Sequence, residues 1–128
     1  MSVAPPTPRL VATPAGVTLG PLELIADGKA RNFVLKIGDQ YFHGFVVRRK
    51  DLVRGYVDQC PHAGLPLAQT LDQYLTPGGD LIACSWHGAL FEVRDGACVG
   101  GPCVGQRLKP WPVAVQGGVL VTTTGDVP

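Results

Sequence analysis

The sequence lacks long apolar runs and an excess of either charge. No stretch approaches the roughly 18–20 apolar residues of a membrane-spanning helix, so we expect no membrane span. The 128 residues carry 11 basic and 10 acidic side chains, which gives no electrostatic reason to expect nucleic acid or an anionic membrane as partner. The N-terminal residues do not place a basic segment before an apolar one, as a secretory signal does. We therefore expect a cytoplasmic protein.

Helical periodicity is also missing. No segment keeps a 3.6-residue apolar spacing over a useful length, and 12 prolines and 17 glycines are spread along the chain. Arg31–Ile37 instead alternates, with Phe33, Leu35 and Ile37 on one face, which is typical of a half-buried strand. A turn links it to the apolar run Tyr41–Arg48, and the two predict a hairpin.

Further short strands follow at regular spacing, separated by turn residues. They are expected at Pro21–Leu24, Gly55–Val57, Leu81–Ala83, Leu90–Val93, Cys98–Val99, Trp111–Val115 and Val119–Thr123. This pattern predicts an antiparallel all-β sandwich or barrel. Residues 1–20 are rich in proline and are expected to form an extended or flexible N-terminal arm, with one domain at residues 21–124.

Cysteine and histidine carry the chemistry of this sequence. Cys60 and His62 form a C-x-H pair, and Cys84 and His87 form a C-x-x-H pair, each at the tip of a predicted hairpin. Two neighbouring tips can present four ligands to one point, and thiolate with imidazole suits zinc or an iron–sulfur cluster. In a reducing cytoplasm, cysteines indicate metal or redox chemistry before disulfides.

The two pairs, with their neighbours, resemble the Rieske family. The similarity rests on Cys60–Gly64 (CPHAG) together with Cys84–Gly88 (CSWHG), and it continues through Ala89–Phe91. Gly100–Pro102 resembles the proline-containing loop that shields the cluster in that family. The resemblance implies a Rieske-like sandwich with a small cluster-binding subdomain made of two hairpin loops.

The resemblance also implies a ligand set for one [2Fe–2S] cluster per chain. Rieske proteins hold one iron by two cysteines and the other by two histidines. By position, Cys60 and Cys84 would ligate the buried iron, and His62 and His87 the outer iron. A closed zinc site with the same four ligands is the alternative. It is disfavoured because zinc ribbons use C-x-x-C pairs and zinc fingers place their histidines on a helix.

Departures from one branch of the family predict a low reduction potential. The Rieske proteins of respiratory and photosynthetic complexes carry a disulfide between the two loops, whereas this chain has Leu65 and Trp86 at the corresponding places. That branch also has hydroxyl groups directed at the cluster, whereas the matching positions here are Ala89 and Phe91. Fewer hydrogen bonds to the cluster sulfurs disfavour the reduced state, so we expect a midpoint between about −150 mV and zero.

The resemblance implies a one-electron carrier without catalytic residues, a ferredoxin that passes electrons from a reductase to an oxygenase-type acceptor at the cluster tip. Rieske oxygenases need a second iron held by two histidines and a carboxylate, but only His43 remains once the cluster is ligated. Other candidates are the small Rieske-like subunit of an assimilatory nitrite reductase and a structural zinc-binding module. We expect a monomer or weak oligomer.

Cys98 and Cys103 lie outside the ligand pattern. Both can be buried thiols, which behave as small hydrophobic side chains, or they can form a redox pair. A reducing cytoplasm favours the first interpretation.

Overall fold

The computed structural model describes residue 10 and residues 12–59, 67, 73–84, 88–101 and 103–123. Within these residues the regular structure is nine β-strands and one three-residue 3-10 helix, η1. No helix in this part of the chain is long and apolar enough to cross a membrane. The prediction of an antiparallel all-β fold is confirmed.

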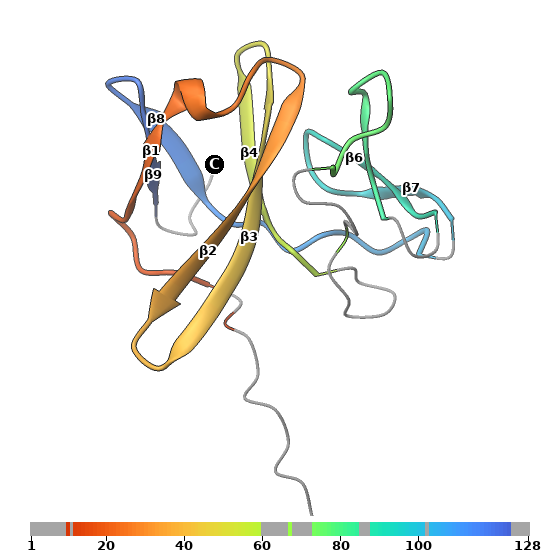
Figure 1. Ribbon diagram of the computed structural model, residues 1–128. Coiled ribbons are helices and arrows are strands. Elements are labelled where there is room, and N and C mark those ends of the chain that lie inside the picture. Colours follow the sequence, from red (N-terminus) through yellow and green to blue (C-terminus); the bar gives the residue numbers. More distant parts are fainter. Residues whose placement is uncertain are drawn as a thin grey trace, which may run out of the picture.

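The strands form three antiparallel sheets of three strands each. The central sheet has β2 (Lys29–Ile37), β3 (Gln40–Arg49) and β4 (Leu52–Val57), in that order. The other two sheets contain, in their spatial order, β1 (Thr18–Pro21), β9 (Val119–Thr122) and β8 (Val113–Gln116), and β5 (Leu81–Ala83), β6 (Leu90–Glu92) and β7 (Cys98–Gly100). The central sheet lies between the other two (Figure 1).

The central sheet is covered on both faces because its side chains alternate. On β3, Phe42 and Val46 enter one hydrophobic cluster. The residues between and beyond them, Phe45 and Val47, enter the other. Both faces are therefore apolar, and β3 forms the middle of the molecule.

The cluster beneath β1, β8 and β9 is organised around Trp111. Its ring packs against Phe42, with ring centroids 4.7 Å apart, and its indole N–H donates to the Thr13 hydroxyl at 2.9 Å. Gly44 lies under the same ring, where a Cβ atom would come within 2.6 Å of Trp111 Cε3. A side chain at position 44 would therefore push this sheet away from β3.

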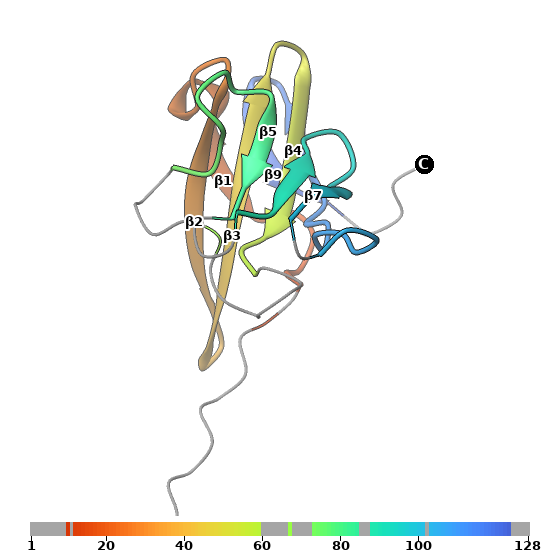
Figure 2. The same ribbon diagram turned by 90° about the vertical axis from the view of Figure 1, so that its right-hand side faces the viewer.

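The opposite cluster joins the central sheet to β5, β6 and β7, which lie in front of it in Figure 2. Within this cluster, the ring of Phe45 in β3 stacks on the ring of Tyr74, with ring centroids 4.2 Å apart and planes 7° from parallel. Ile82 and Phe91 bring β5 and β6 onto the same cluster. This small sheet is the subdomain that carries the second Cys/His pair.

The first strand does not lie where the sequence predicts it. Pro21–Leu24 was expected to be extended, but Leu22–Leu24 forms η1, in which the Ile25 N–H donates to the Leu22 carbonyl at 3.0 Å. The helical turn brings Leu22 and Ile25 to the same apolar cluster, a contact that an extended chain would not make at this spacing.

The actual first strand, β1, begins inside the segment expected to be an arm. It pairs with β9, and the Gly16 N–H donates to the Thr122 carbonyl at 2.8 Å. The described residues 12–20 therefore pack against the sandwich. Residues 1–9 and 11 lie outside the described residues, so a flexible arm there stays a prediction.

Candidate metal centre

The second Cys/His pair begins at the end of β5. Cys84 is buried, its N–H donates to the Ala89 carbonyl at 2.8 Å, and its carbonyl accepts from the Gly88 N–H at 3.1 Å. Gly88 has a φ of +70°, a conformation that side chains other than glycine rarely adopt. These contacts fix the positions of Cys84 and Gly88, on either side of residues 85–87.

A second loop packs directly on this turn. Gly101 has a φ of +84°, and a Cβ atom there would come within 2.8 Å of Ala89 Cα and 3.1 Å of the Gly88 carbonyl oxygen. Only glycine satisfies both the backbone angle and the space. The loop after β7 therefore touches the backbone of Gly88 and Ala89, and its role in shielding a cluster stays a prediction.

The first Cys/His pair follows β4, and Asp58 anchors its base. The Asp58 side chain is 6% exposed, and its Oδ1 accepts a hydrogen bond from the Leu67 N–H at 2.9 Å. The Asp58 N–H in turn donates to the His43 carbonyl of β3 at 2.9 Å. Asp58 thus ties both sides of the segment containing Cys60 and His62 to the central sheet.

The Asp58 carboxylate belongs to a buried polar network. Its Oδ2 accepts from the Tyr74 hydroxyl at 2.9 Å and from the Asn32 amide at 3.4 Å, and Asn32 also donates to the Tyr74 oxygen at 2.8 Å. A buried polar group that loses its hydrogen-bond partner destabilises the folded protein. This network therefore favours one arrangement of the loop base. No short motif joins Asn32, Asp58 and Tyr74, so the sequence alone does not indicate this network.

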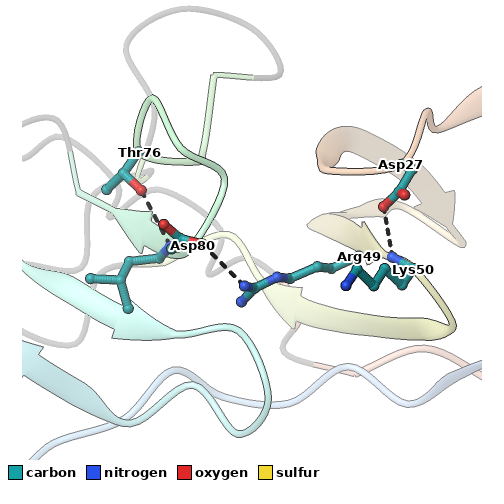
Figure 3. A network of polar contacts seen from close by, with 6 residues as sticks. Asp27, Arg49, Lys50, Thr76 and Asp80 are labelled. Atoms are coloured by element: carbon teal, nitrogen blue, oxygen red, sulfur yellow. Dashed lines mark hydrogen bonds and ion pairs between the residues drawn. The ribbon is translucent and has the colours of Figure 1, made fainter.

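A surface contact holds the segment between the two pairs (Figure 3). The Arg49 guanidinium lies 3.1 Å from the Asp80 carboxylate, linking the end of β3 to the turn before β5. Thr76 accepts from the Leu81 N–H through its hydroxyl at 3.3 Å and closes the latter turn. Both ion-pair side chains are largely solvent-exposed, so this contact orients the turn more than it stabilises the fold.

The structure describes only one of the four predicted ligands, Cys84. Cys84 is buried in the cluster that also contains Leu67 from the first loop. Cys60, His62 and His87 lie outside the described residues, as do Leu65, Trp86 and Pro102. Their predicted roles stay predictions.

The two positions expected to lack a hydroxyl are both completely buried. Ala89 and Phe91 have no exposed surface and pack in the same cluster as Cys84. Neither side chain can donate a hydrogen bond. Sequence and burial thus agree on an apolar environment beside Cys84.

The all-β scaffold brings Cys84 and Leu67, one residue from each of the two loop segments, into one apolar cluster. The profile described as "Rieske [2Fe-2S] domain" matches residues 21–117. This range covers most of the chain and both Cys/His pairs. The chain therefore belongs to the Rieske [2Fe-2S] domain family, and the family prediction is confirmed.

Individual relatives agree with this assignment. The chain is 34% identical over 73 residues to the ferredoxin component of the p-cumate 2,3-dioxygenase system of Pseudomonas putida, a match that spans 56% of each chain. The chain thus covers little more than half the length of that relative. Over 86% of its residues, it superposes on 98% of the ferredoxin of carbazole 1,9a-dioxygenase from Nocardioides aromaticivorans IC177, with a TM-score of 0.65 and 24% identity.

The same fold occurs inside a larger protein. The terminal oxygenase of carbazole 1,9a-dioxygenase from Novosphingobium sp. KA1 matches over 89% of this chain but only 31% of its own, with a TM-score of 0.70 and 21% identity. This likeness shows a shared fold only. The fold by itself therefore does not separate a carrier from the Rieske domain of an oxygenase.

The described residues fit the [2Fe–2S] cluster that the family carries. The buried Cys84 thiol offers a soft ligand in an apolar cluster, and the donor set of two cysteines and two histidines in the sequence is that of a Rieske centre. Among the described residues, apart from its chain neighbours, Gly88 has no atom within 4 Å of the position that a Cβ would take, which leaves space at this point of the backbone. Nothing in the described part of the site conflicts with the cluster.

Proposed function

We propose that the chain is a one-electron carrier whose [2Fe–2S] cluster is held by Cys60, Cys84, His62 and His87. The observation that supports this most directly is the shared cluster of Cys84 with Leu67, since it brings the second ligand loop and a residue of the first onto one apolar core. When bound, the cluster accepts and donates one electron.

Residues of the chain would set the polarity and the hydrogen bonding around the cluster. The buried Ala89 and Phe91 exclude water from the side of Cys84 and offer no hydroxyl donor. Without such donors the more negative reduced state is less stabilised. The proposed carrier therefore works at the low end of the Rieske range, between about −150 mV and zero.

We propose a reductase as electron donor and a terminal oxygenase as acceptor, in the cytoplasm. Two of the matched relatives are ferredoxins of dioxygenase systems. These 128 residues do not themselves supply the second iron site of an oxygenase, because after cluster ligation only His43 is left among their histidines.

The partner would dock beside the cluster-shielding loop. Val99 and Val104, on either side of Gly101, are 49% and 66% exposed. Exposed apolar side chains around a redox centre suit the small interfaces of electron-transfer encounters. On the opposite side of the central sheet, Val115 is 39% exposed and provides a matched control.

A potentiometric titration of the cluster-loaded protein tests the proposed carrier. We expect one reversible one-electron transition with a midpoint between about −150 mV and zero. In Phe91→Tyr, the added hydroxyl should raise the midpoint, because Phe91 packs in the same cluster as Cys84, whereas Tyr41→Phe on the exposed hairpin should leave it unchanged. A strongly positive wild-type midpoint would contradict the proposed environment.

Docking is tested separately with the cognate reductase and oxygenase. Val104→Asp should slow electron transfer several-fold without changing the midpoint potential, because it places a charge in the apolar contact. Val115→Asp should have no effect on either quantity. Equal rates for the two variants would place the docking surface elsewhere.

A further inference from the structure

Two buried thiols outside the ligand pattern lie in contact with each other. The Cys103 Sγ lies 2.8 Å from the Cys98 Sγ, and the Cys98 Sγ lies 3.1 Å from the Gly100 carbonyl oxygen. Cys98 is 7% exposed and Cys103 is 1% exposed. The two thiols therefore form a contact pair at the edge of the small sheet.

The backbone holds this pair in place. The Cys98 N–H donates to the Gln106 carbonyl, and the Gln106 N–H donates to the Cys103 carbonyl, both at 2.9 Å. Gln106 thus ties the chain on both sides of residues 99–102. Cysteines whose backbones are far apart need a rearrangement before they can be bridged, but here the sulfurs already meet.

We propose that Cys98 and Cys103 are a dithiol oxidation site, which hydrogen peroxide converts into an intramolecular disulfide. If Cys98 and Cys103 served only as small hydrophobic side chains, their sulfurs would not need to be in contact. In the structure the Cys103 thiol instead donates to the Cys98 sulfur, and the Cys98 thiol donates to a carbonyl. Of these two cysteines, Cys98 is the more exposed, and we therefore expect peroxide to react with it first.

The reaction proceeds in two balanced steps. The Cys98 sulfur attacks one peroxide oxygen, so that an S–O bond forms, the O–O bond breaks and water leaves, giving a sulfenic acid. The Cys103 sulfur then attacks the Cys98 sulfur, so that the S–S bond forms, the S–O bond breaks and a second water leaves. The two thiols lose two protons and two electrons, and these convert one peroxide into two waters.

The bond would restrain the loop that packs on the second Cys/His turn. It closes a ring from residue 98 to residue 103, and this ring contains Gly101, which touches the Ala89 backbone. Oxidation would therefore remove freedom from the cluster-shielding loop without using any of the four candidate ligands. The inference does not depend on which metal the ligands hold.

Trypsin separates this site from the candidate ligands. Cleavage after Arg94 and Arg107 releases residues 95–107, which contain Cys98 and Cys103. Cleavage after Arg54 and Arg94 releases residues 55–94, which contain the other two cysteines. Each cysteine pair can therefore be followed by mass in its own peptide, even if peroxide damages the metal centre.

The test treats the folded, cluster-loaded protein with hydrogen peroxide, unfolds it and blocks the remaining thiols with iodoacetamide before digestion. We expect peptide 95–107 without alkylation and two hydrogens lighter than its dithiol form, and doubly alkylated when a reductant precedes the iodoacetamide. Cys103→Ser should abolish this species, because the sulfenic acid then has no thiol to react with. Untreated protein should give the doubly alkylated peptide.

Three results would overturn the proposal. The first is a doubly alkylated peptide 95–107 after peroxide treatment. The second is a sulfinic or sulfonic acid on Cys98 or Cys103 while the other stays a thiol. The third is a disulfide that joins this peptide to residues 55–94, which would show that the sulfurs react with the ligand cysteines instead of with each other.

Discussion

Replacing Gly101 with alanine tests the contact between the shielding loop and the second Cys/His turn. The new Cβ would lie 2.8 Å from Ala89 Cα and 3.1 Å from the Ala89 nitrogen, both backbone atoms that cannot rotate away. The φ of +84° is a second obstacle, because L-residues other than glycine are strained in this region. Two independent costs therefore act at one position.

The two costs can be estimated separately. The left-handed backbone costs about 1–2 kcal/mol for a residue with a Cβ. Forcing an extra carbon into a packed contact costs about 1–3 kcal/mol more. We therefore expect Gly101→Ala to lower the free energy of unfolding by about 2–5 kcal/mol.

Gly105→Ala is the matched control. Gly105 has a φ of +97°, but in the described part of the chain no atom beyond its neighbours in sequence lies within 4 Å of the position of a Cβ, so only the backbone cost of about 1–2 kcal/mol applies. Urea unfolding of the cluster-loaded variants, followed by circular dichroism and by cluster absorbance, measures both effects. Equal losses for Gly101→Ala and Gly105→Ala would refute the contact with the cluster-binding turn.

Two further predictions concern buried hydroxyl groups. Tyr74→Phe should cost about 1–3 kcal/mol in urea unfolding, since Asp58 and Asn32 lose a partner, and Tyr41→Phe on the exposed hairpin should cost little. Burial raises the pKa of Tyr56, whose hydroxyl donates to the Val93 carbonyl. The contribution of the Tyr56 hydroxyl to the free energy of unfolding is fully present below the ordinary tyrosine pKa of about 10. It is lost as the pH rises above that value. The urea midpoint should therefore fall at alkaline pH, and fall less in Tyr56→Phe; identical alkaline curves would contradict this.

Local patterns were enough to predict most of the strands. The alternation in Arg31–Ile37 and the apolar run after it correspond to β2 and β3, which pair in register from Lys29 with Arg48 to Ile37 with Gln40. Pro21–Leu24 resembles a short strand because three of its residues are apolar or favour an extended backbone, but Leu22–Leu24 forms η1. Its 3-10 turn is stabilised by packing of Leu22 and Ile25 on a distant part of the chain, which no local pattern reports.

The candidate site was predictable where it depends on motifs and unpredictable where it depends on distant partners. The Cys/His spacing indicates the ligand chemistry, and Gly101 falls in a loop that family resemblance marks. Asp58, Asn32 and Tyr74 meet only because β2, β4 and the segment before β5 fold together. The contact between the Cys98 and Cys103 sulfurs likewise depends on the turn after β7, since their spacing alone also suits two unrelated buried thiols.

The central claim is that Cys60, His62, Cys84 and His87 hold a [2Fe–2S] cluster. The most direct test is the iron, acid-labile sulfide and zinc content of the purified protein, measured together with its electron paramagnetic resonance spectrum after reduction. We predict a red-brown protein with two irons and two sulfides per chain and a spectrum typical of mixed cysteine and histidine ligation. A colourless protein with one zinc and no labile sulfide would contradict the account.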